Sequence, residues 1–342
     1  MTVLFGDNGE GKTNIIEAVY FLATLRSFRT SEASDLLQQG AGQARVAADV
    51  SKGGLDRRVA VKIEPGRRIV TLDGKAVRGA AALFGGFNAV VFVPEDLRLP
   101  RGAPAARRRF LDLAVFGVER GYYREAAAFQ RVLKSRNALL RASEPEAALL
   151  DAYDEELART GARVTVRRRA LASALAPRVA EAFRSIAGSV PAAIRYRSDP
   201  AVEAAREEPA VNVALHDGLR ARRALDVRRR RTTFGPQTDD LDVLLDGRLA
   251  REHASQGQIR SLVLALKLAE LSHLEECLGE PPVLLLDDVA GELDPARREY
   301  LFAMIETLSC QTMVSVTDRS LLPAFADHEY FQVAKGQLRP VT

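Results

Sequence analysis

The sequence predicts an α/β fold whose parallel sheet is split by a mostly helical insertion. A short apolar strand at residues 3–5 runs into a glycine-rich turn and then an amphipathic helix at residues 14–25. Near the other end, a second apolar strand at residues 283–286 stops at two aspartates. Between them, residues 119–187 follow an almost unbroken helical pattern. One α/β domain is therefore expected to open and close the chain, with the helical segment inserted into it.

Composition places the chain among ordinary globular proteins. Its 342 residues are 47% hydrophobic and 27% charged, and the length is typical of about two domains. Two cysteines and four histidines exclude a disulfide framework and argue against a histidine-based metal enzyme. No apolar run reaches the ~18 residues of a membrane span, and the start has neither the basic nor the long apolar region of a signal peptide. A cytoplasmic protein is expected.

The glycine-rich turn matches the phosphate-binding P-loop, G-x-x-x-x-G-K-[ST]. Its glycines let successive backbone N–H groups point at phosphate oxygens, and the helix that follows directs its positive end at the same anion. The lysine is expected to reach the β- and γ-phosphates and the threonine hydroxyl to bind Mg²⁺, so we predict an ATP site; a turn without a ligand is the alternative. The matching residues are Gly6, Asp7, Asn8, Gly9, Glu10, Gly11, Lys12 and Thr13.

The smaller predicted strands follow in order. Residues 45–50, 58–64, 68–72 and 75–77 predict an antiparallel side sheet, with Asp73-Gly74 as a hairpin turn. Residues 88–93 form a nearly all-apolar strand, residues 312–316 another, and residues 331–333 and 337–339 a closing hairpin.

The middle of the chain is predicted to hold two long antiparallel helices, an arm. Residues 119–141 would form the first helix, and Ser143–Glu146 would open the second as a capping box, with Pro177 as its limit. An ordinary helical subdomain is the alternative. Three parts follow: residues 1–112 and 227–342 as the two halves of the head, and residues 113–226 as the arm. Apolar residues recur every seven positions, the spacing of a helix seam, at Leu150, Leu157, Val164 and Leu171.

Asp287 and Asp288 end the apolar strand 283–286, at the sheet edge where open α/β sheets bind ligands. Asp287 is expected to hold Mg²⁺ together with Thr13, and Asp288 to orient or deprotonate the attacking water. A strand end with a capping aspartate is the alternative. Lys12 and Asp287 lie near opposite ends of the chain, whereas small GTPases and nucleotide kinases place these elements much closer. The ATPase fold must therefore be split by the insertion.

A second anion site is predicted where Ser255, Gln256, Gly257 and Gln258 open a long, buried helix that reaches residue 278. The alternative is that Ser255 only caps this helix. The order of P-loop, insertion, S-x-G-Q and strand with Asp resembles the ATP-binding-cassette head of the structural-maintenance-of-chromosomes type. In that group the S-x-G-Q helix faces the γ-phosphate of the partner subunit.

Six blocks of sequence follow one another along the chain: GDNGEGKTNIIEAVYFLATLRSFRT, VFVPEDLRLPRGAPAARRRFLD, LKSRNALLR, TTFGPQTDDLDVLLDGR, ASQGQIRSLVLALKLAEL and PVLLLDDVAGELD. In this order they resemble the RecF family of bacterial recombination mediators. The resemblance implies a cytoplasmic, ATP-dependent DNA-binding protein that dimerises on ATP and has weak, DNA-stimulated ATPase activity. It also implies work with RecR, help in placing RecA at single-strand gaps, and links to replication, repair, recombination and the SOS response.

The sequence departs from the family at several places. The family usually begins further upstream, whereas Met1 here lies inside the P-loop strand; a misassigned start or a truncation would explain this, and missing strands would leave an open sheet edge. Gln237 and Thr238 stand where the family commonly has His-Arg. Thr317-Asp318 stands where many cassette ATPases carry a histidine that senses the γ-phosphate.

Three arginine clusters, residues 107–109, 167–169 and 228–231, are either phosphate contacts or solvated helix faces. The chain has no stripe of alternating basic and aromatic residues, so binding to single- or double-stranded DNA would be driven by the backbone and independent of sequence. The strongest candidates are four adjacent cations, Arg228, Arg229, Arg230 and Arg231.

Two other functions compete with this interpretation. One is another cassette-type ATPase, such as the nucleotide-binding subunit of a transporter; the long helical insertion argues against it. The other is a scaffold that binds DNA and protein partners but has lost control by ATP.

Overall fold

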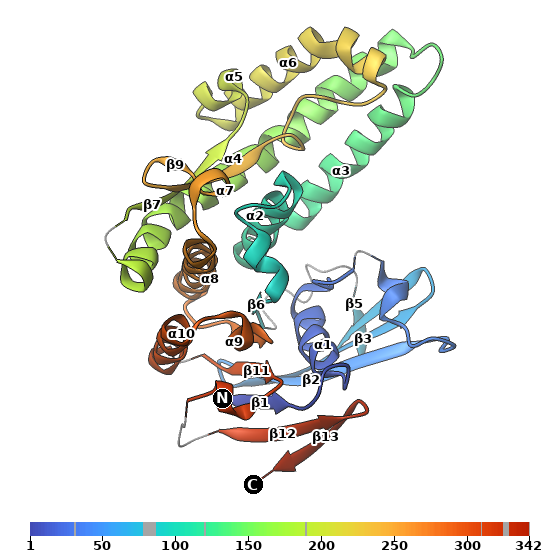
Figure 1. Ribbon diagram of the computed structural model, residues 1–342. Coiled ribbons are helices and arrows are strands. Elements are labelled where there is room, and N and C mark those ends of the chain that lie inside the picture. The colour runs from blue at the N-terminus through green and yellow to red at the C-terminus, as the bar shows by residue number, and fades with distance from the viewer. Residues whose placement is uncertain are drawn as a thin grey trace. The chain divides into compact units, whose positions relative to one another are not determined.

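The computed structural model describes the chain except for residues 31, 78–86, 120, 189, 309, 324–327 and 342 (Figure 1). Arg120, inside the expected helical region, lies outside the described residues. The chain divides into two compact units: Met1–Leu97 with Glu270–Thr342, and Arg98–Ala269. No helix in the described ranges is both long and apolar enough to cross a membrane.

The first unit is built on a six-stranded sheet in the order β13-β12-β1-β11-β10-β6. All neighbours are parallel except β12 and β13, which form the closing hairpin. β1 pairs with β11 on one side and β12 on the other, so the P-loop strand lies inside the sheet. The strands are β1 (Thr2–Phe5), β6 (Ala89–Phe92), β10 (Val283–Asp287), β11 (Thr312–Val316), β12 (Glu329–Ala334) and β13 (Gln337–Val341).

Helix α1 (Lys12–Thr24) packs its apolar face on this sheet. Ile16 and Tyr20 meet Leu4 of β1 and Leu285 of β10 in one buried cluster. Because β1, β10 and β11 run parallel, the P-loop and Asp287 emerge at the same edge of the sheet. The predicted helix at residues 14–25 and the predicted apolar strands at residues 3–5 and 283–286 are confirmed.

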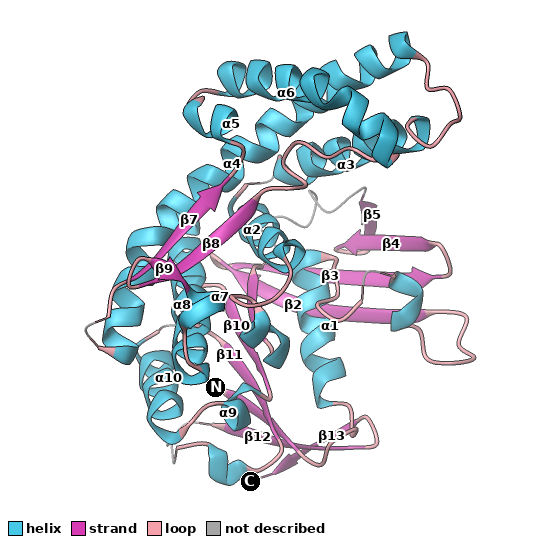
Figure 2. Cartoon of the chain, turned by 45° about the horizontal axis from the view of Figure 1, so that its top comes forward, coloured by secondary structure: helices cyan, strands magenta, loops and turns pink. Residues whose placement is uncertain are grey.

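The first unit also contains the predicted side sheet, an antiparallel array in the order β2-β3-β4-β5 (Figure 2). Asp73 and Gly74 both have positive φ, as the expected two-residue hairpin turn requires. The strands are β2 (Ala44–Lys52), β3 (Leu55–Glu64), β4 (Arg67–Leu72) and β5 (Lys75–Val77). The remaining elements of the unit are η1 (Ala33–Leu36), α9 (Val289–Glu292), α10 (Pro295–Thr307) and η4 (Arg319–Leu321); η3 (Pro94–Arg98) ends at the boundary.

The second unit is a helical subdomain with a small sheet, and the two helices predicted for the arm are α3 and α4 within it. The 41-residue helix α4 packs against both α3 and α6, and β7, β8 and β9 form an antiparallel sheet beside it. The heptad residues Leu150, Leu157, Val164 and Leu171 are all buried, as predicted. The elements are α2 (Pro104–Val118), α3 (Tyr122–Leu139), α4 (Ala147–Ala187), β7 (Ala192–Arg197), α5 (Pro200–Ala204), α6 (Glu208–Arg229), β8 (Asp240–Leu245), β9 (Arg248–Leu249), α7 (Ala250–His253) and α8 (Gln256–Leu278), which crosses into the first unit.

Two details of the helical prediction are wrong. The helix α4 begins at Ala147 with Glu146 as its N-cap and no side-chain cap, so Ser143 lies too far upstream to form a capping box. The helix also continues through Pro177 to Ala187. An internal proline costs about 3 kcal/mol, but Val179 and Phe183, both buried beyond it, hold the last turns in place.

The boundaries of the two units differ from the expected divisions at 112/113 and 226/227. Helix α2 packs on α4 and β8, and β8 pairs with β7 from the middle of the chain. Residues 98–112 and 227–269 therefore belong to the helical unit, and the second range includes the segment Ser255–Gln258.

Candidate nucleotide site

The P-loop curls around the ammonium group of Lys12. Gly9 and Gly11 adopt left-handed backbone conformations, with φ of 85° and 106°, which favour glycine. The Lys12 side chain is buried and its Nζ donates to the carbonyl oxygens of Gly6 at 2.6 Å and Asp7 at 2.9 Å. The positive charge of Lys12 thus lies inside the P-loop, where it would neutralise a bound phosphate.

The hairpin β12–β13 braces the P-loop from outside. Glu10 accepts a hydrogen bond from the backbone N–H of Lys335 at its carboxylate and one from Gly336 at its carbonyl oxygen, the latter at 2.9 Å. A Cβ on Gly6 would lie 2.4 Å from the carbonyl oxygen of Val333, so only glycine fits there. No local pattern in the sequence indicates this contact, because its two sides lie at opposite ends of the chain.

Asp287 lies beside Thr13, as the predicted metal site requires. Thr13 Oγ1 donates to Asp287 Oδ1 at 3.1 Å, and Ser315 Oγ of β11 donates to the same oxygen at 2.7 Å. Ser315 was not predicted; it stands opposite Asp287 in the strand register and orients its carboxylate. The described residues contain no cluster of three His, Cys, Asp or Glu side chains arranged to hold a metal. One hydroxyl and one carboxylate suit Mg²⁺, which usually keeps several waters and takes further ligands from phosphates.

Asp288 is placed differently from Asp287. Its φ of 51° is left-handed, and its backbone N–H donates to Ser315 Oγ at 3.0 Å. Among the described residues, its carboxylate has no hydrogen-bond or ion-pair partner, so it is available to a water molecule. Burial raises the pKa of this carboxyl, Lys12 lowers it, and the negative charges of Asp287 and Glu292 raise it, with a net result above the usual value.

The segment Ser255–Gln258 forms a reciprocal cap at the start of α8. The Ser255 N–H donates to Gln258 Oε1 at 2.8 Å, and the Gln258 N–H donates to Ser255 Oγ at 3.2 Å. Arg101 donates to the carbonyl oxygen of Ala254, directly before the cap. Ser255 therefore caps α8. That it only caps the helix is not tested by these bonds. Ser255 and Gln256 are exposed, so the predicted contact with a partner's phosphate remains open to test.

Comparison with known proteins agrees with this geometry. Residues 1–337 match the family described as the RecF/RecN/SMC N terminal domain. The chain is 44% identical to the DNA replication and repair protein RecF of Anaeromyxobacter sp. (strain Fw109-5) over 99% of its length and 93% of the relative's. It is also 44% identical to RecF of Myxococcus xanthus (strain DK1622), over 98% and 90%.

The chain belongs to the RecF family. Its fold matches a solved structure titled as the recombination mediator protein RecF-ATP in the RecFOR pathway, with a TM-score of 0.91 and 29% identity over 100% of this chain and 91% of that one. A likeness to an Smc head bound to the C-winged helix domain of ScpA, with a TM-score of 0.55 and 16% identity over 99% and 89%, shows the fold alone. The predicted cassette-type head is thus confirmed.

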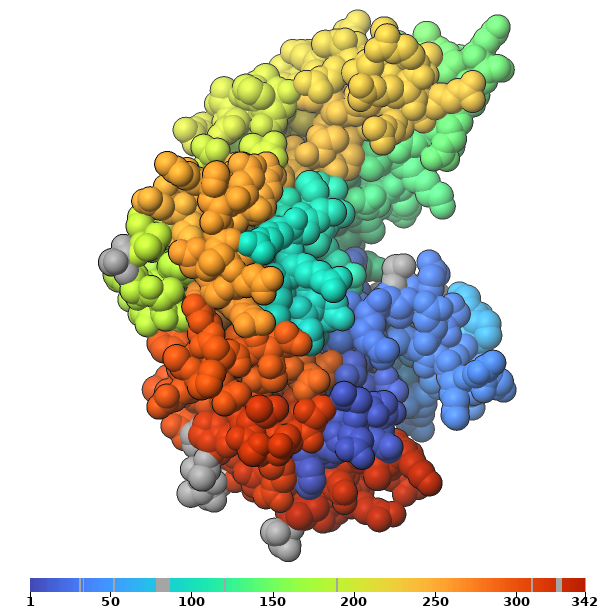
Figure 3. All heavy atoms as spheres, in the orientation of Figure 1, coloured from blue at the N-terminus to red at the C-terminus, as the bar shows by residue number. Residues whose placement is uncertain are grey.

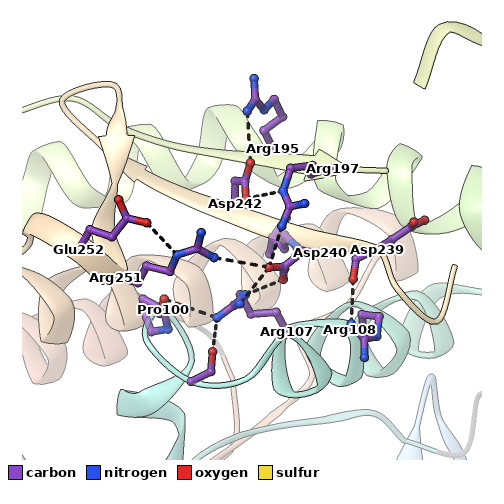
Figure 4. A network of polar contacts seen from close by, with 12 residues as sticks. Pro100, Arg107, Arg108, Arg195, Arg197, Asp239, Asp240, Asp242, Arg251 and Glu252 are labelled. Atoms are coloured by element: carbon purple, nitrogen blue, oxygen red, sulfur yellow. Dashed lines mark hydrogen bonds and ion pairs between the residues drawn. The ribbon is translucent and has the colours of Figure 1, made fainter. Parts of the chain in front are cut away.

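Two of the three arginine clusters are largely structural in this RecF-family chain. Arg107 is buried and binds Asp240 through two hydrogen bonds of 2.7 and 2.9 Å, while Arg197 and Arg251 approach the same carboxylate from β7 and α7 (Figure 4). Burial raises the pKa of Asp240, but the hydrogen bonds and charge of Arg107, the Leu241 N–H and the charge of Arg197 together lower it below its usual value. In the second cluster, Arg168 is buried against Asp112 at 2.7 Å.

Gln237 and Thr238, which replace the family's common His-Arg, make local turn bonds. Gln237 Nε2 donates to the Phe234 carbonyl oxygen at 2.8 Å, and Thr238 Oγ1 to that of Gly235 at 2.7 Å. The next residue, Asp239, accepts a hydrogen bond from Tyr196 at 2.5 Å, and burial raises its pKa to about 6. The contacts of Gln237 and Thr238 therefore stabilise the loop before β8.

The third cluster, Arg228–Arg231, is exposed at the end of α6. Arg230 takes a left-handed conformation with φ of 52° and ends the helix. In sequence this cluster looks like the other two, because the acids that neutralise Arg107 and Arg168 are distant in the chain.

Proposed function

We propose that this protein is an ATP-dependent DNA-binding protein of replication and recombinational repair. ATP with Mg²⁺ would join the heads of two copies on DNA, and slow, DNA-stimulated hydrolysis would release them. The observation that carries this proposal is the convergence of Lys12, Thr13 and Asp287 at one sheet edge, with the Thr13 hydroxyl 3.1 Å from the Asp287 carboxylate.

Each residue has a defined part in the proposed reaction. Backbone N–H groups of residues 6–13 would hold the phosphates, and Lys12 would neutralise them. Thr13 and Asp287 would hold Mg²⁺, whose charge stabilises the phosphoryl group in transfer. Asp288, unpartnered among the described residues, would orient the attacking water and accept its proton.

The cap at Ser255–Gln258 would act on the nucleotide of the partner copy. An exposed helix start offers backbone N–H groups and a hydroxyl to an anion. Each closed dimer would then contain two composite sites, so ATP binding and dimerisation would be linked.

The partners follow from family membership. The names of the relatives and of the solved structure refer to replication, repair and the RecFOR pathway. We extend to this chain the partners RecR and duplex or single-stranded DNA, a part in loading RecA at single-strand gaps, and a cytoplasmic location. The scaffold alternative is disfavoured by a complete P-loop in contact with Asp287.

Light scattering tests the proposal directly. The molar mass should double with ATP and Mg²⁺, and the dimer should then bind duplex DNA. Lys12→Ala should abolish both effects, whereas Lys75→Ala, which removes an exposed lysine from β5, should preserve them. An unchanged mass with ATP, in a protein shown by filter binding to hold ATP, would rule out the dimer switch.

A further inference from the structure

The exposed face of α3 carries four cations and no acid. Arg124, Arg131, Lys134 and Arg141 are exposed and spaced by seven, three and seven residues, which places them along one side of the helix and its C-terminal turn. The row spans about 25 Å at 1.5 Å per residue. Glu125 is the only acid within α3, and it faces Arg167 of α4 instead, at 3.7 Å.

The end of α6 is fixed next to this row. Thr232 donates to Asn137 Oδ1 of α3 through its N–H at 2.7 Å and its hydroxyl at 2.8 Å. Deeper inside, Arg136 pairs with Asp154 at 2.6 Å and Asp226 at 2.8 Å, and all three side chains are fully buried. Residues 228–231 therefore lie against the part of α3 that carries Lys134 and Arg141, and Figures 1 and 3 show the ends of the two helices side by side.

Together these eight residues form what we call the arm-end basic surface: Arg124, Arg131, Lys134, Arg141, Arg228, Arg229, Arg230 and Arg231. In the described part of the chain, none of the eight side chains makes an ion pair. Glu144 and Glu146, both exposed, follow Arg141 in the loop before α4. Elsewhere in this unit, arginines find carboxylates, as Arg222 does with Asp199 and Arg223 with Asp151. Eight gathered cations repel one another, so the surface is suited to an anionic partner.

We propose that the arm-end basic surface binds the phosphate backbone of a nucleic-acid duplex. The proposal rests on the proposed function and names the surface that would contact the DNA. A row of about 25 Å matches roughly seven base pairs at 3.4 Å each. Guanidinium groups, which supply seven of the eight charges, bind phosphate oxygens through two parallel hydrogen bonds.

The surroundings of the row favour the backbone over the bases. Phe129 is buried, and Tyr123 packs edge-on against Phe116 with ring centroids 5.9 Å apart, so α3 offers no exposed ring on which a base could stack. Contacts would therefore be independent of sequence, and their strength would fall with salt because phosphates release counterions.

A quadruple variant of α3 alone tests the new part of the surface: Arg124→Ala, Arg131→Ala, Lys134→Ala and Arg141→Ala. These side chains are exposed and unpaired within the described ranges, so the fold should be unaffected. A matched control removes the same charge from exposed, separate positions: Arg45→Ala, Arg67→Ala, Arg184→Ala and Arg206→Ala. Both variants should dimerise with ATP as the parent does.

Fluorescence anisotropy with a labelled duplex, ATP and a series of salt concentrations gives the decisive readout. The α3 variant should lose affinity about tenfold or more at low salt, and its plot of log K against log salt should be shallower by about 0.9 for each phosphate that the variant no longer neutralises. The control should stay within about twofold of the parent and keep its slope.

Equal affinity and slope in the α3 variant and the control would overturn the proposal. Absence of any ATP-dependent duplex binding in the parent would instead mean that the proposed function has failed.

Discussion

Replacing Asp288 with asparagine removes one negative charge and little else. The residue has a φ of 51°, and asparagine is among the few non-glycine residues that adopt this conformation readily. The hydrogen bonds from the Asp288 N–H to Ser315 should be kept, because the backbone of residue 288 donates them. Asp287 and Thr13 are untouched, so the variant should still bind ATP and Mg²⁺.

The expected loss in hydrolysis is about 100-fold. A well-placed general base contributes on the order of 10² to 10⁴ in rate. Cassette ATPases usually place a glutamate here, and an aspartate is shorter by one methylene, about 1.5 Å. Because a displacement of about 1 Å can cost around 100-fold, the parent should already turn over slowly, well below about 1 s⁻¹. Asp288 should therefore contribute near the lower end of the range for a general base, about 100-fold in rate. This corresponds to about 2.7 kcal/mol of activation free energy.

The pH profile gives a second readout of the same group. Asp288 must be ionised to accept a proton, and its pKa is raised by burial and by Asp287 and Glu292, partly offset by Lys12. Parent activity should therefore fall, as pH decreases, at a higher pH than an ordinary aspartate would give. Glu292→Gln removes one of the charges that raise this pKa, so its midpoint should move to lower pH. Asp288→Asn should show no such transition.

Single-turnover phosphate release measures the rate of hydrolysis and its pH dependence, and filter retention measures the bound ATP. Asp288→Asn should retain ATP and persist as a DNA-bound dimer. Hydrolysis at the parent rate by this variant would remove Asp288 from the mechanism, and an unchanged midpoint in Glu292→Gln would show that the pH dependence has another source.

Four further variants separate the remaining roles. Lys12→Ala should abolish ATP binding in a filter assay; retained binding would contradict the role of its ammonium. Ser315→Ala should keep ATP binding but raise the Mg²⁺ concentration needed for half-maximal hydrolysis, because Asp287 loses its 2.7 Å hydrogen bond; an unchanged titration would refute this. Glu10→Ala removes the side-chain bond to Lys335 and should weaken ATP binding about fivefold, the effect of about 1 kcal/mol; equal affinity would mean that the brace is dispensable. Ser255→Asp keeps a capping side chain but adds a negative charge, so monomers should bind ATP while dimerisation fails; normal dimers would exclude a phosphate contact in trans.

The parts of the site predicted from the sequence are those made within short segments. The P-loop conformation depends on its own glycines, and Asp287 follows directly from the end of a buried strand. The supports of these residues come from elsewhere: Ser315 from the neighbouring strand β11, and Lys335 and Gly336 from the β12–β13 turn. A pairing between strands that are distant in the chain leaves no local pattern, so these residues could not be found.

The sequence alone also could not distinguish the buried arginine clusters from the exposed one. Arg107 and Arg168 look like the exposed Arg228 when only neighbours in sequence are considered. Their burial depends on Asp240 and Asp112, which the fold brings within 2.7 Å of them. The fold class was predictable because it depends on the order of strands and helices. Whether a charged side chain is buried or exposed depends on tertiary packing.

The two interpretations of Ser255 turn out to be compatible. Its Oγ accepts one hydrogen bond from Gln258, at 3.2 Å, which satisfies the helix start. A hydroxyl also has an O–H donor and a second lone pair, so the cap does not consume the donor that a phosphate would need. The positive end of the α8 helix dipole favours an anion at the same place. A residue that caps the helix in one copy can therefore donate to the nucleotide of another without giving up its cap. For this reason the sequence could not decide between the two roles: the same side chain has hydrogen-bonding groups for both.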